Sequence, residues 1–401
     1  MDCNAGPVPV RAGGVAGSAC IPRRFIRADP GRVPARRMNP RKSSLWNRGS
    51  ASIKFWDPAF TFVPVFLSGA GLILIRLTAD RAFAAQGLFI LAGIGIFVGV
   101  SVTGYSAFIR FSQILYGGLC LLLLATLLIG PAVSGSRAWL VLGPFHFQPA
   151  EWMKPVLALV LAEVLTRSPA SPLKVLAYSA PPLILILLQP DFGTAVSLSI
   201  VVAVALFFQR ISWRVVAVAA ACGVVMFLLA WFLLFKPYQK QRILTFVFPS
   251  YATSRSGYQA RQSLIAVGSG RTLGKGLSLS TQSQLRFLPA RHTDFIFANL
   301  AERRGFVGTA VCLSLYVYLI LRMLHAGNHS PEPEGKYLAY MAAGFLAFHV
   351  MYNIGMVVAL VPITGIPLPF MSYGGSFLTA CYFTAGLMNI VSLGRFGSYE
   401  R

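Results

Sequence analysis

Residues 111–130 read FSQILYGGLCLLLLATLLIG and contain no charged side chain. An α-helix needs about 20 mostly apolar residues to cross the hydrocarbon core of a bilayer, so this stretch is long enough to span it. Similar apolar runs recur along the chain and are separated by shorter polar segments. The sequence therefore predicts an all-α polytopic membrane protein.

Ten apolar runs predict ten transmembrane helices. They cover residues 58–77, 83–102, 110–130, 151–166, 173–188, 192–209, 214–235, 296–323, 336–360 and 374–393. The division between the fifth and sixth runs is the least distinct, because only Gln189-Pro190-Asp191 separates them. A single helix of about 37 residues would be too long for one crossing, so two helices are expected there.

The composition agrees with a membrane protein. Of 401 residues, 56% are apolar and only 12% are charged, whereas soluble domains carry about 25% charged residues. These values exclude a cytosolic globular enzyme, and the aromatic content excludes a disordered chain. The six cysteines are far apart and form no CxxC pair, so they predict neither a disulfide framework nor a zinc site.

The basic residues are unevenly distributed. Residues 1–57 hold many Arg and Lys without an apolar period, and we interpret them as a disordered cytoplasmic N-terminal tail, not a signal peptide. Alternatively, Met38 is the true start. The helices then occupy residues 58–395, and the positive-inside rule places both termini in the cytoplasm.

The segment 236–293 lies outside the membrane on this count, as a large periplasmic loop between helices 7 and 8. It carries nine basic residues and no acid. Long loops cross a membrane regardless of charge, so the topology stands. The excess positive charge suggests an anionic ligand.

Four polar stretches, three of which contain Pro and Gly, fall on the outer side in this topology. They are residues 134–154, 189–194, 291–295 and 362–376. Irregular backbone at membrane depth is tolerated only where it is buried in protein or lines a cavity. The four stretches therefore predict one outward-facing cavity. The alternative is that they are ordinary, separate loops between helices.

Ionisable residues near these stretches are candidates for function. Glu151 and Lys154 are three residues apart, so they share a helix face and can pair. Asp191 is either a helix N-cap or a substrate contact. Glu163 is expected to be a structural polar residue inside the bundle.

Asp294 is the only acid between Asp191 and Glu302 and follows the basic segment. A carboxylate beside clustered cations is what a general base next to a diphosphate would look like. The alternative role is an N-cap of the eighth helix. His292 is the competing base.

Some motifs are absent from the sequence. It contains no GxxxxGK[ST] loop, no HExxH and no Asp-x-Asp pair. A built-in P-loop ATPase is thereby excluded. A lipid-linked sugar donor fits better than a soluble sugar nucleotide, and no nucleic-acid partner is expected.

Nine motifs along residues 58–395 resemble those of the shape, elongation, division and sporulation (SEDS) family, the peptidoglycan polymerases represented by RodA and FtsW. They are GSRAW at 135–139, FQPAE at 147–151, QPDFGTA at 189–195, QRILTF at 241–246, GYQARQS at 257–263, GKG at 274–276, FLPARHTDFIFA at 287–298, NIGM at 353–356 and PLPFMSYGGS at 367–376. TQSQL at 281–285 and VPITGIPLPF at 361–370 are more similar to the RodA branch. The chain departs from the family pattern at Arg271-Thr272, Ser280 and Arg303-Arg304, which leaves the geometry around Asp294 open.

The resemblance implies an inverting glycosyltransferase that polymerises lipid II for cell-wall elongation and releases undecaprenyl diphosphate. Asp294 would be catalytic. Substrate contacts are expected at Glu151, Lys154, Asp191, Arg242, Tyr258, Gln262, Lys275, His292, Thr293 and Ser372. No cofactor is implied with certainty, and a magnesium or manganese ion beside the diphosphate is left open.

The resemblance also implies the bacterial inner membrane and a class B penicillin-binding protein transpeptidase as partner. The elongation proteins MreC and MreD are implied only by analogy. Two other functions remain open. One is an FtsW-like division polymerase, and the other is a lipid II flippase, a transporter without an ATPase.

Overall fold

The computed structural model describes residues 56–133, 135–143, 145–167, 171–209, 231–232, 235, 237–248, 255–276, 287 and 290–394. The predicted N-terminal tail therefore lies outside the described residues, apart from its last two positions. Most of the predicted seventh span, 214–235, and the 281–285 motif also lie outside them.

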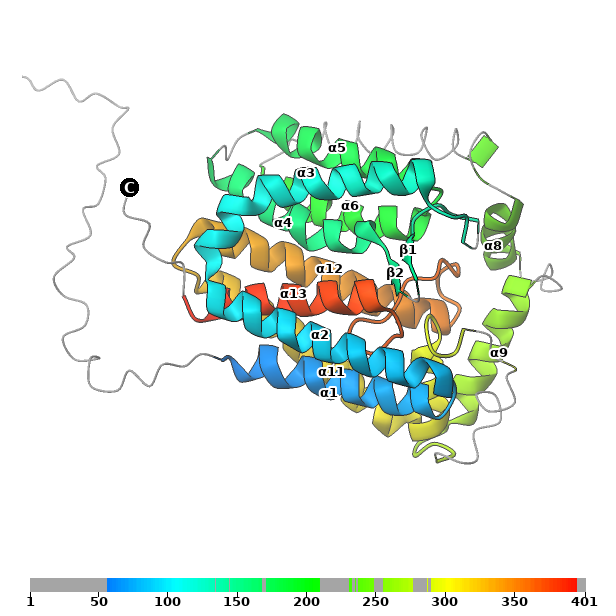
Figure 1. The fold of residues 1–401 in the computed structure, drawn as a ribbon. Coiled ribbons are helices and arrows are strands. Elements are labelled where there is room, and N and C mark those ends of the chain that lie inside the picture. The colour runs from blue at the N-terminus through cyan, green and yellow to red at the C-terminus, as the bar shows by residue number, and fades with distance from the viewer. Residues whose placement is uncertain are drawn as a thin grey trace, which may run out of the picture. The chain divides into compact units, whose positions relative to one another are not determined.

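The described part of the chain is predominantly helical (Figure 1). Its helices are α1 Pro58–Arg76, α2 Asp80–Thr103, α3 Tyr105–Ile129, α4 Pro149–Arg167, α5 Pro172–Leu188, α6 Phe192–Phe207, α8 Pro237–Val247, α9 Arg255–Ser269, α11 Ile296–Asn328, α12 Pro333–Val357 and α13 Gly375–Ser392. Two short antiparallel strands, β1 Leu140–Leu142 and β2 Phe145–Phe147, form a hairpin between α3 and α4, in which Leu140 pairs with Phe147.

Five of the described helices are long and apolar enough to cross a membrane. They are α1, α2, α3, α11 and α12. Side chains on their outer faces are apolar and exposed, such as Ile114 and Leu121 on α3. Because a soluble protein would not leave such a surface in water, this arrangement is that of a multi-pass membrane protein.

The boundary between the fifth and sixth predicted spans is confirmed. α5 ends at Leu188 and α6 begins at Phe192, with Asp191 as its N-cap, whose carboxylate accepts a hydrogen bond from the Thr194 backbone N–H at 3.2 Å. The N-cap role that the sequence allowed for Asp191 is therefore present. It satisfies a backbone donor that has no partner within the helix.

Two helices, α4 and α13, form the centre of the bundle. Nearly every side chain from Pro149 to Leu165 is buried, and so is nearly every one from Ser376 to Val391. α13 packs against α2 and α4, and α4 packs against α3 and α12 (Figure 1). A helix that is buried all round gives fixed positions for the polar side chains it carries.

Several buried polar side chains of the bundle form hydrogen bonds between helices. Glu163 on α4 accepts hydrogen bonds from Ser112 and Gln113 of α3 and forms an ion pair with Arg167 at 2.9 Å. Glu163 is therefore a structural polar residue, as expected from the sequence. Among the described cysteines, Cys120, Cys312 and Cys381 are free thiols within apolar packing.

α11 is interrupted at Gly305, whose φ of 62° lies in the left-handed region that glycine tolerates. The segment after α9 docks against this break. The backbone N–H of Lys275 donates to the Glu302 carbonyl at 2.9 Å, and that of Phe306 donates to the Arg271 carbonyl at 2.8 Å. The end of α9 is thus tied by main-chain hydrogen bonds to the helix that follows Asp294.

Candidate active site

The structure has a cavity of about 510 Å³ to which all four of the predicted stretches contribute. The hairpin, α8 and α9 lie at this end of the bundle (Figure 1). The polar lining residues are Ser136, Gln148, Glu151, Lys154, Asp191, Thr194, Ser197, Gln239, Arg242, Thr293, Asp294, His349, Thr364, Tyr373 and Ser376. Residues from 133 to 377 thus meet around one space, as the sequence predicted.

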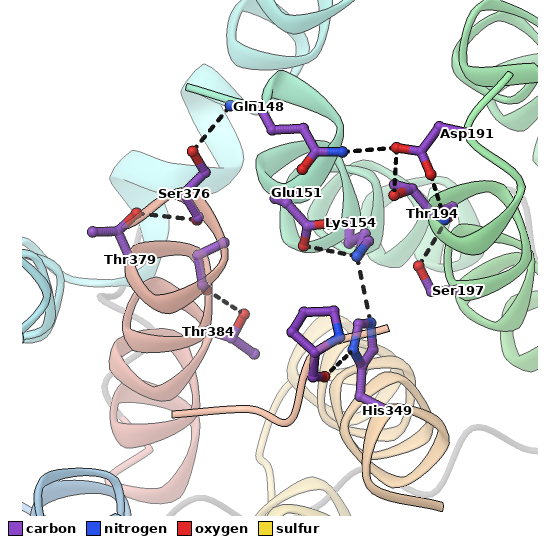
Figure 2. Close-up of polar contacts among 12 residues, drawn as sticks. Gln148, Glu151, Lys154, Asp191, Thr194, Ser197, His349, Ser376, Thr379 and Thr384 are labelled. Atoms are coloured by element: carbon purple, nitrogen blue, oxygen red, sulfur yellow. Dashed lines mark hydrogen bonds and ion pairs between the residues drawn. The ribbon is translucent and has the colours of Figure 1, made fainter. Parts of the chain in front are cut away.

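Glu151 and Lys154 form the predicted ion pair, with 2.8 Å between Nζ and Oε2 (Figure 2). Both side chains are buried. The Lys154 ammonium also lies 3.4 Å from Nε2 of His349 and faces the rings of Phe345 and Phe377 at about 5.5 Å. The carboxylate and the aromatic faces compensate the ammonium charge in this buried position.

Asp191 belongs to a second polar group in the cavity wall (Figure 2). Its Oδ2 accepts hydrogen bonds from Gln148 Nε2 at 2.7 Å and from the Thr194 hydroxyl at 2.9 Å. The backbone N–H of Gln148 donates to the Ser376 hydroxyl at 2.9 Å. This network connects α13, the start of α4 and the start of α6.

Asp294 lines the same cavity, in a turn immediately before α11. The N-cap of α11 is Phe295 and has no side-chain capping bond, so the capping role considered for Asp294 is wrong. Burial raises the pKa of Asp294 to about 6, although the charge of Arg242 and a hydrogen bond from Thr293 oppose the rise. A carboxylate with this pKa can both take and hold a proton near neutral pH.

The backbone on both sides of Asp294 is anchored. The carbonyl of Asp294 accepts a hydrogen bond from Asn353 Nδ2 at 2.9 Å, and the carbonyl of Thr293 accepts one from the Ser372 hydroxyl at 2.7 Å. Ser372 is buried and does not line the cavity, so it supports the Asp294 turn from behind.

His292, the competing base, is not among the residues that line the cavity. Its ring packs edge-on against Tyr373, with 5.8 Å between ring centroids. Burial and the neighbouring Arg291 lower its pKa, which favours the neutral imidazole. The geometry therefore favours Asp294 over His292 as the group in contact with a substrate.

The two cations of the long segment that were expected to contact substrate lie in different places. Arg242 on α8 lines the cavity with Asp294. Lys275 does not line it, and its ammonium lies 3.3 Å from the buried Glu302 carboxylate. Tyr258 and Gln262 are on α9 and do not line the cavity either.

The sequence did not identify His349 as a site residue. It lies in the middle of α12, a candidate membrane span, where a lone histidine is an unusual residue and a signal of function. Gln148 and Asn353 occur in two of the quoted motifs, but no role was predicted for either. Their side chains act on Asp191 and on the backbone of Asp294, contacts that residue spacing does not reveal.

The described residues do not form a complete metal site by themselves, so a divalent cation beside the diphosphate would also need oxygen ligands from the substrate. Among the described residues, no group of three His, Cys, Asp or Glu side chains comes together that could hold a metal ion. Glu151 is neutralised by Lys154, and Asp191 accepts from Gln148 and Thr194. We therefore assign no step to a metal.

Comparison with known proteins gives consistent results. Residues 63–395 match the family described as cell cycle protein and named for FtsW, RodA and SpoVE. The peptidoglycan glycosyltransferase MrdB of Escherichia coli K12 is 40% identical over 65% of this chain and 72% of its own length. The probable peptidoglycan glycosyltransferase FtsW of Idiomarina loihiensis is 32% identical over 89% of this chain and 92% of its own.

Solved structures show the same likeness. A chain of a peptidoglycan synthase complex that coordinates polymerization and crosslinking superposes with a TM-score of 0.75, at 29% identity over 85% of this chain and 99% of that chain. The rod shape determining protein RodA of Thermus thermophilus superposes with a TM-score of 0.63, at 29% identity over 85% of this chain and 98% of its own. The match over residues 63–395, together with these relatives, shows that the chain belongs to the FtsW/RodA/SpoVE family of cell cycle proteins, the SEDS family, and is RodA-like.

Proposed function

We propose that this protein is a peptidoglycan glycosyltransferase that polymerises lipid II into glycan strands during cell-wall elongation. The observation that carries the proposal is the position of Asp294, a carboxylate with a raised pKa, in one cavity with Arg242. The relatives named as peptidoglycan glycosyltransferases support it.

In the proposed reaction Asp294 is the general base. Its carboxylate takes the proton from the 4-hydroxyl of the acceptor GlcNAc as that oxygen attacks the anomeric carbon of the donor MurNAc. The bond from that carbon to the diphosphate breaks, and undecaprenyl diphosphate leaves with the bonding electrons. A direct displacement of this kind inverts the anomeric configuration.

The departing diphosphate gains negative charge, which positive groups in the cavity stabilise. Arg242 and Lys154 are the cations on the cavity wall that suit this role. Lys154 is paired with Glu151, and Arg242 lines the cavity together with Asp294, so both cations are candidates for contact with the diphosphate. Asp191, Thr293 and Glu151 also line the cavity and are the proposed contacts for hydroxyl and amide groups of the substrate.

The same proposal includes a ten-helix topology in the bacterial inner membrane, with both termini in the cytoplasm and 236–293 on the periplasmic side. A class B penicillin-binding protein is the proposed transpeptidase partner, which the likeness to a peptidoglycan synthase complex supports. MreC and MreD remain proposed partners by analogy.

The test is polymerisation of purified lipid II by the detergent-solubilised protein with its partner. Asp294→Asn keeps the size of the side chain and removes the base, so we expect the rate to fall about 10²–10⁴-fold. Glu332→Gln, which also removes one carboxylate but at an exposed position before α12, is the matched control and should keep the rate.

Two outcomes would contradict the proposal. Near-normal glycan synthesis by well-folded Asp294→Asn would remove Asp294 from the mechanism and return attention to His292. No polymerisation by the unmodified protein, together with translocation of lipid II across vesicle membranes, would instead favour a flippase.

A further inference from the structure

One face of α12 carries two buried polar side chains a single helical turn apart. His349 is 1% exposed and Asn353 is 0% exposed. Residues four apart project from the same face of a helix. A buried polar group is costly unless its hydrogen bonds are satisfied, so the partners of these two residues indicate what they do.

His349 is held in one tautomer by its two neighbours. Its Nδ1 lies 3.1 Å from the carbonyl oxygen of Pro367, which can only accept, so Nδ1 carries the proton. Its Nε2 lies 3.4 Å from the Lys154 ammonium, which can only donate, so Nε2 is unprotonated. A protonated imidazole would place two positive charges 3.4 Å apart. The contacts therefore require a neutral ring.

The ring and the ammonium share one aromatic enclosure. His349 stacks on Phe377 with 4.8 Å between ring centroids and contacts Phe345 at 4.6 Å. Lys154 faces the same two rings. The two phenylalanine rings restrict the imidazole plane. The Lys154 ammonium lies between Glu151 and His349, as Figure 2 shows.

Asn353 makes a second connection of this kind, one helical turn further along α12. Its Nδ2 donates to the carbonyl of Ile366 at 2.8 Å and to the carbonyl of Asp294 at 2.9 Å. Ile366 and Pro367 are adjacent in the chain. Lys154, His349, the 366–367 backbone, Asn353 and Asp294 therefore form one continuous series of hydrogen-bonded contacts.

We propose that His349 and Asn353 are positioning residues that fix the Lys154 ammonium and the Asp294 carboxylate relative to each other, with α12 as the rigid spacer between them. This inference rests on the proposed function, because it assigns the two fixed groups to the leaving-group side and the acceptor side of glycosyl transfer. Displacing a catalytic group by about 1 Å can cost 10²-fold in rate, so a change in such a spacer should lower turnover.

The first test is independent of activity. In protein labelled with ¹⁵N-histidine, the His349 resonances, assigned by their loss in His349→Gln, should report a neutral ring with its proton on Nδ1. Lys154→Met should shift the Nε2 resonance, because it removes the donor. An imidazolium, an Nε2–H tautomer or an Nε2 resonance indifferent to Lys154→Met would overturn the proposal.

The second test measures kcat and KM for lipid II. His349→Leu fills the space but removes both contacts, and should lower kcat about tenfold or more with a smaller change in KM. His349→Gln can donate to Pro367 and accept from Lys154, so it should recover most of the loss. Met351→Leu, at an exposed position on the same helix, should match the unmodified protein.

The third test separates positioning from a general loss of structure. His349→Leu and Asn353→Ala act on the same backbone segment, so their combined effect on kcat should be smaller than the product of the single effects. Multiplicative losses, or losses that follow thermal stability alone, would contradict the proposal. An inactive Asp294→Asn beside a fully active His349→Leu would leave the proposed function intact and remove only this inference.

Discussion

Gly365 lies directly against the carboxylate of Asp294, and a Cβ atom placed on it would be 3.4 Å from Oδ2. Gly365 has a φ of 83°, a backbone conformation that side chains rarely adopt. Gly365 belongs to the 362–367 segment, which forms one wall of the cavity. The carbonyls of Ile366 and Pro367 connect this segment to α12 through Asn353 and His349. The missing side chain of Gly365 leaves the approach to Asp294 open.

Gly365→Ala should impair both stability and turnover. An alanine in the left-handed conformation costs about 1–2 kcal/mol, and its methyl group would occupy space next to Oδ2. We expect a lower unfolding midpoint and a lower rate of lipid II polymerisation. Gly104→Ala is the control, because Gly104 has a φ of 86° and no atom within 4 Å of its Cβ position. It should lose similar stability and retain its kcat. Equal activity of the two variants would contradict the role given to Gly365.

The polymerisation rate should rise with pH through a value of about 6, the raised pKa of Asp294. A general base acts in its ionised form, which is about one tenth of the total at pH 5 and nine tenths at pH 7. Arg242→Met removes the positive charge that opposes the rise, so the ascending limb should move to higher pH. The profile of kcat/KM against pH measures both effects. If the ascending limb of the pH profile stayed at the same pH in Arg242→Met, Arg242 would not influence the pKa of Asp294.

Asp294→Asn should not destabilise the protein at neutral pH. The pKa of Asp294 is higher in the folded protein than its ordinary value of 3.8, so the folded state favours the protonated carboxyl. Raising the pH through the interval from 3.8 to about 6 therefore makes this residue's contribution to stability less favourable. The neutral amide avoids that cost. Thermal unfolding at pH 7 should give a midpoint equal to or above that of the unmodified protein, and a marked decrease would contradict the burial of this carboxylate.

Lys275→Met should reduce stability more than activity. Lys275 pairs with Glu302, whose side chain is 0% exposed. Replacing Lys275 by Met therefore leaves the buried Glu302 carboxylate without that cation. We expect a loss of roughly 1–3 kcal/mol, because Lys275 itself is partly exposed. Adding Glu302→Gln should recover part of the loss. If Lys275→Met instead had normal stability but lost polymerisation activity, the result would support the diphosphate contact that the sequence predicted for Lys275.

The topology can be tested with single cysteines in a background without native cysteines. Leu273→Cys, at a 77% exposed position after α9, should react in intact cells with a thiol reagent that cannot cross the inner membrane. His329→Cys, at an exposed position between α11 and α12, should react only after the membrane is permeabilised. The opposite labelling pattern would reverse the proposed orientation.

The sequence by itself determined the apolar helices that fall on the described residues, but not α8 and α9, which lie in the segment predicted as a loop. Apolar runs set their lengths, and Pro190 and Asp191 set the boundary between α5 and α6, because a proline turn and an N-cap act within a few residues of the chain. The Glu151–Lys154 pair was equally predictable, since a spacing of three on a helix brings two side chains together whatever surrounds them.

Only the tertiary structure decided which polar residues share the cavity. Arg242 and Lys275 had equal standing in the sequence, yet one lines the cavity with Asp294 and the other pairs with Glu302. His349 and Asn353 reach Lys154 and Asp294 from positions 195 and 59 residues away. Contacts over such separations depend on how α12 packs against α4 and α11, and that packing results from the burial of many side chains at once. No local pattern encodes it.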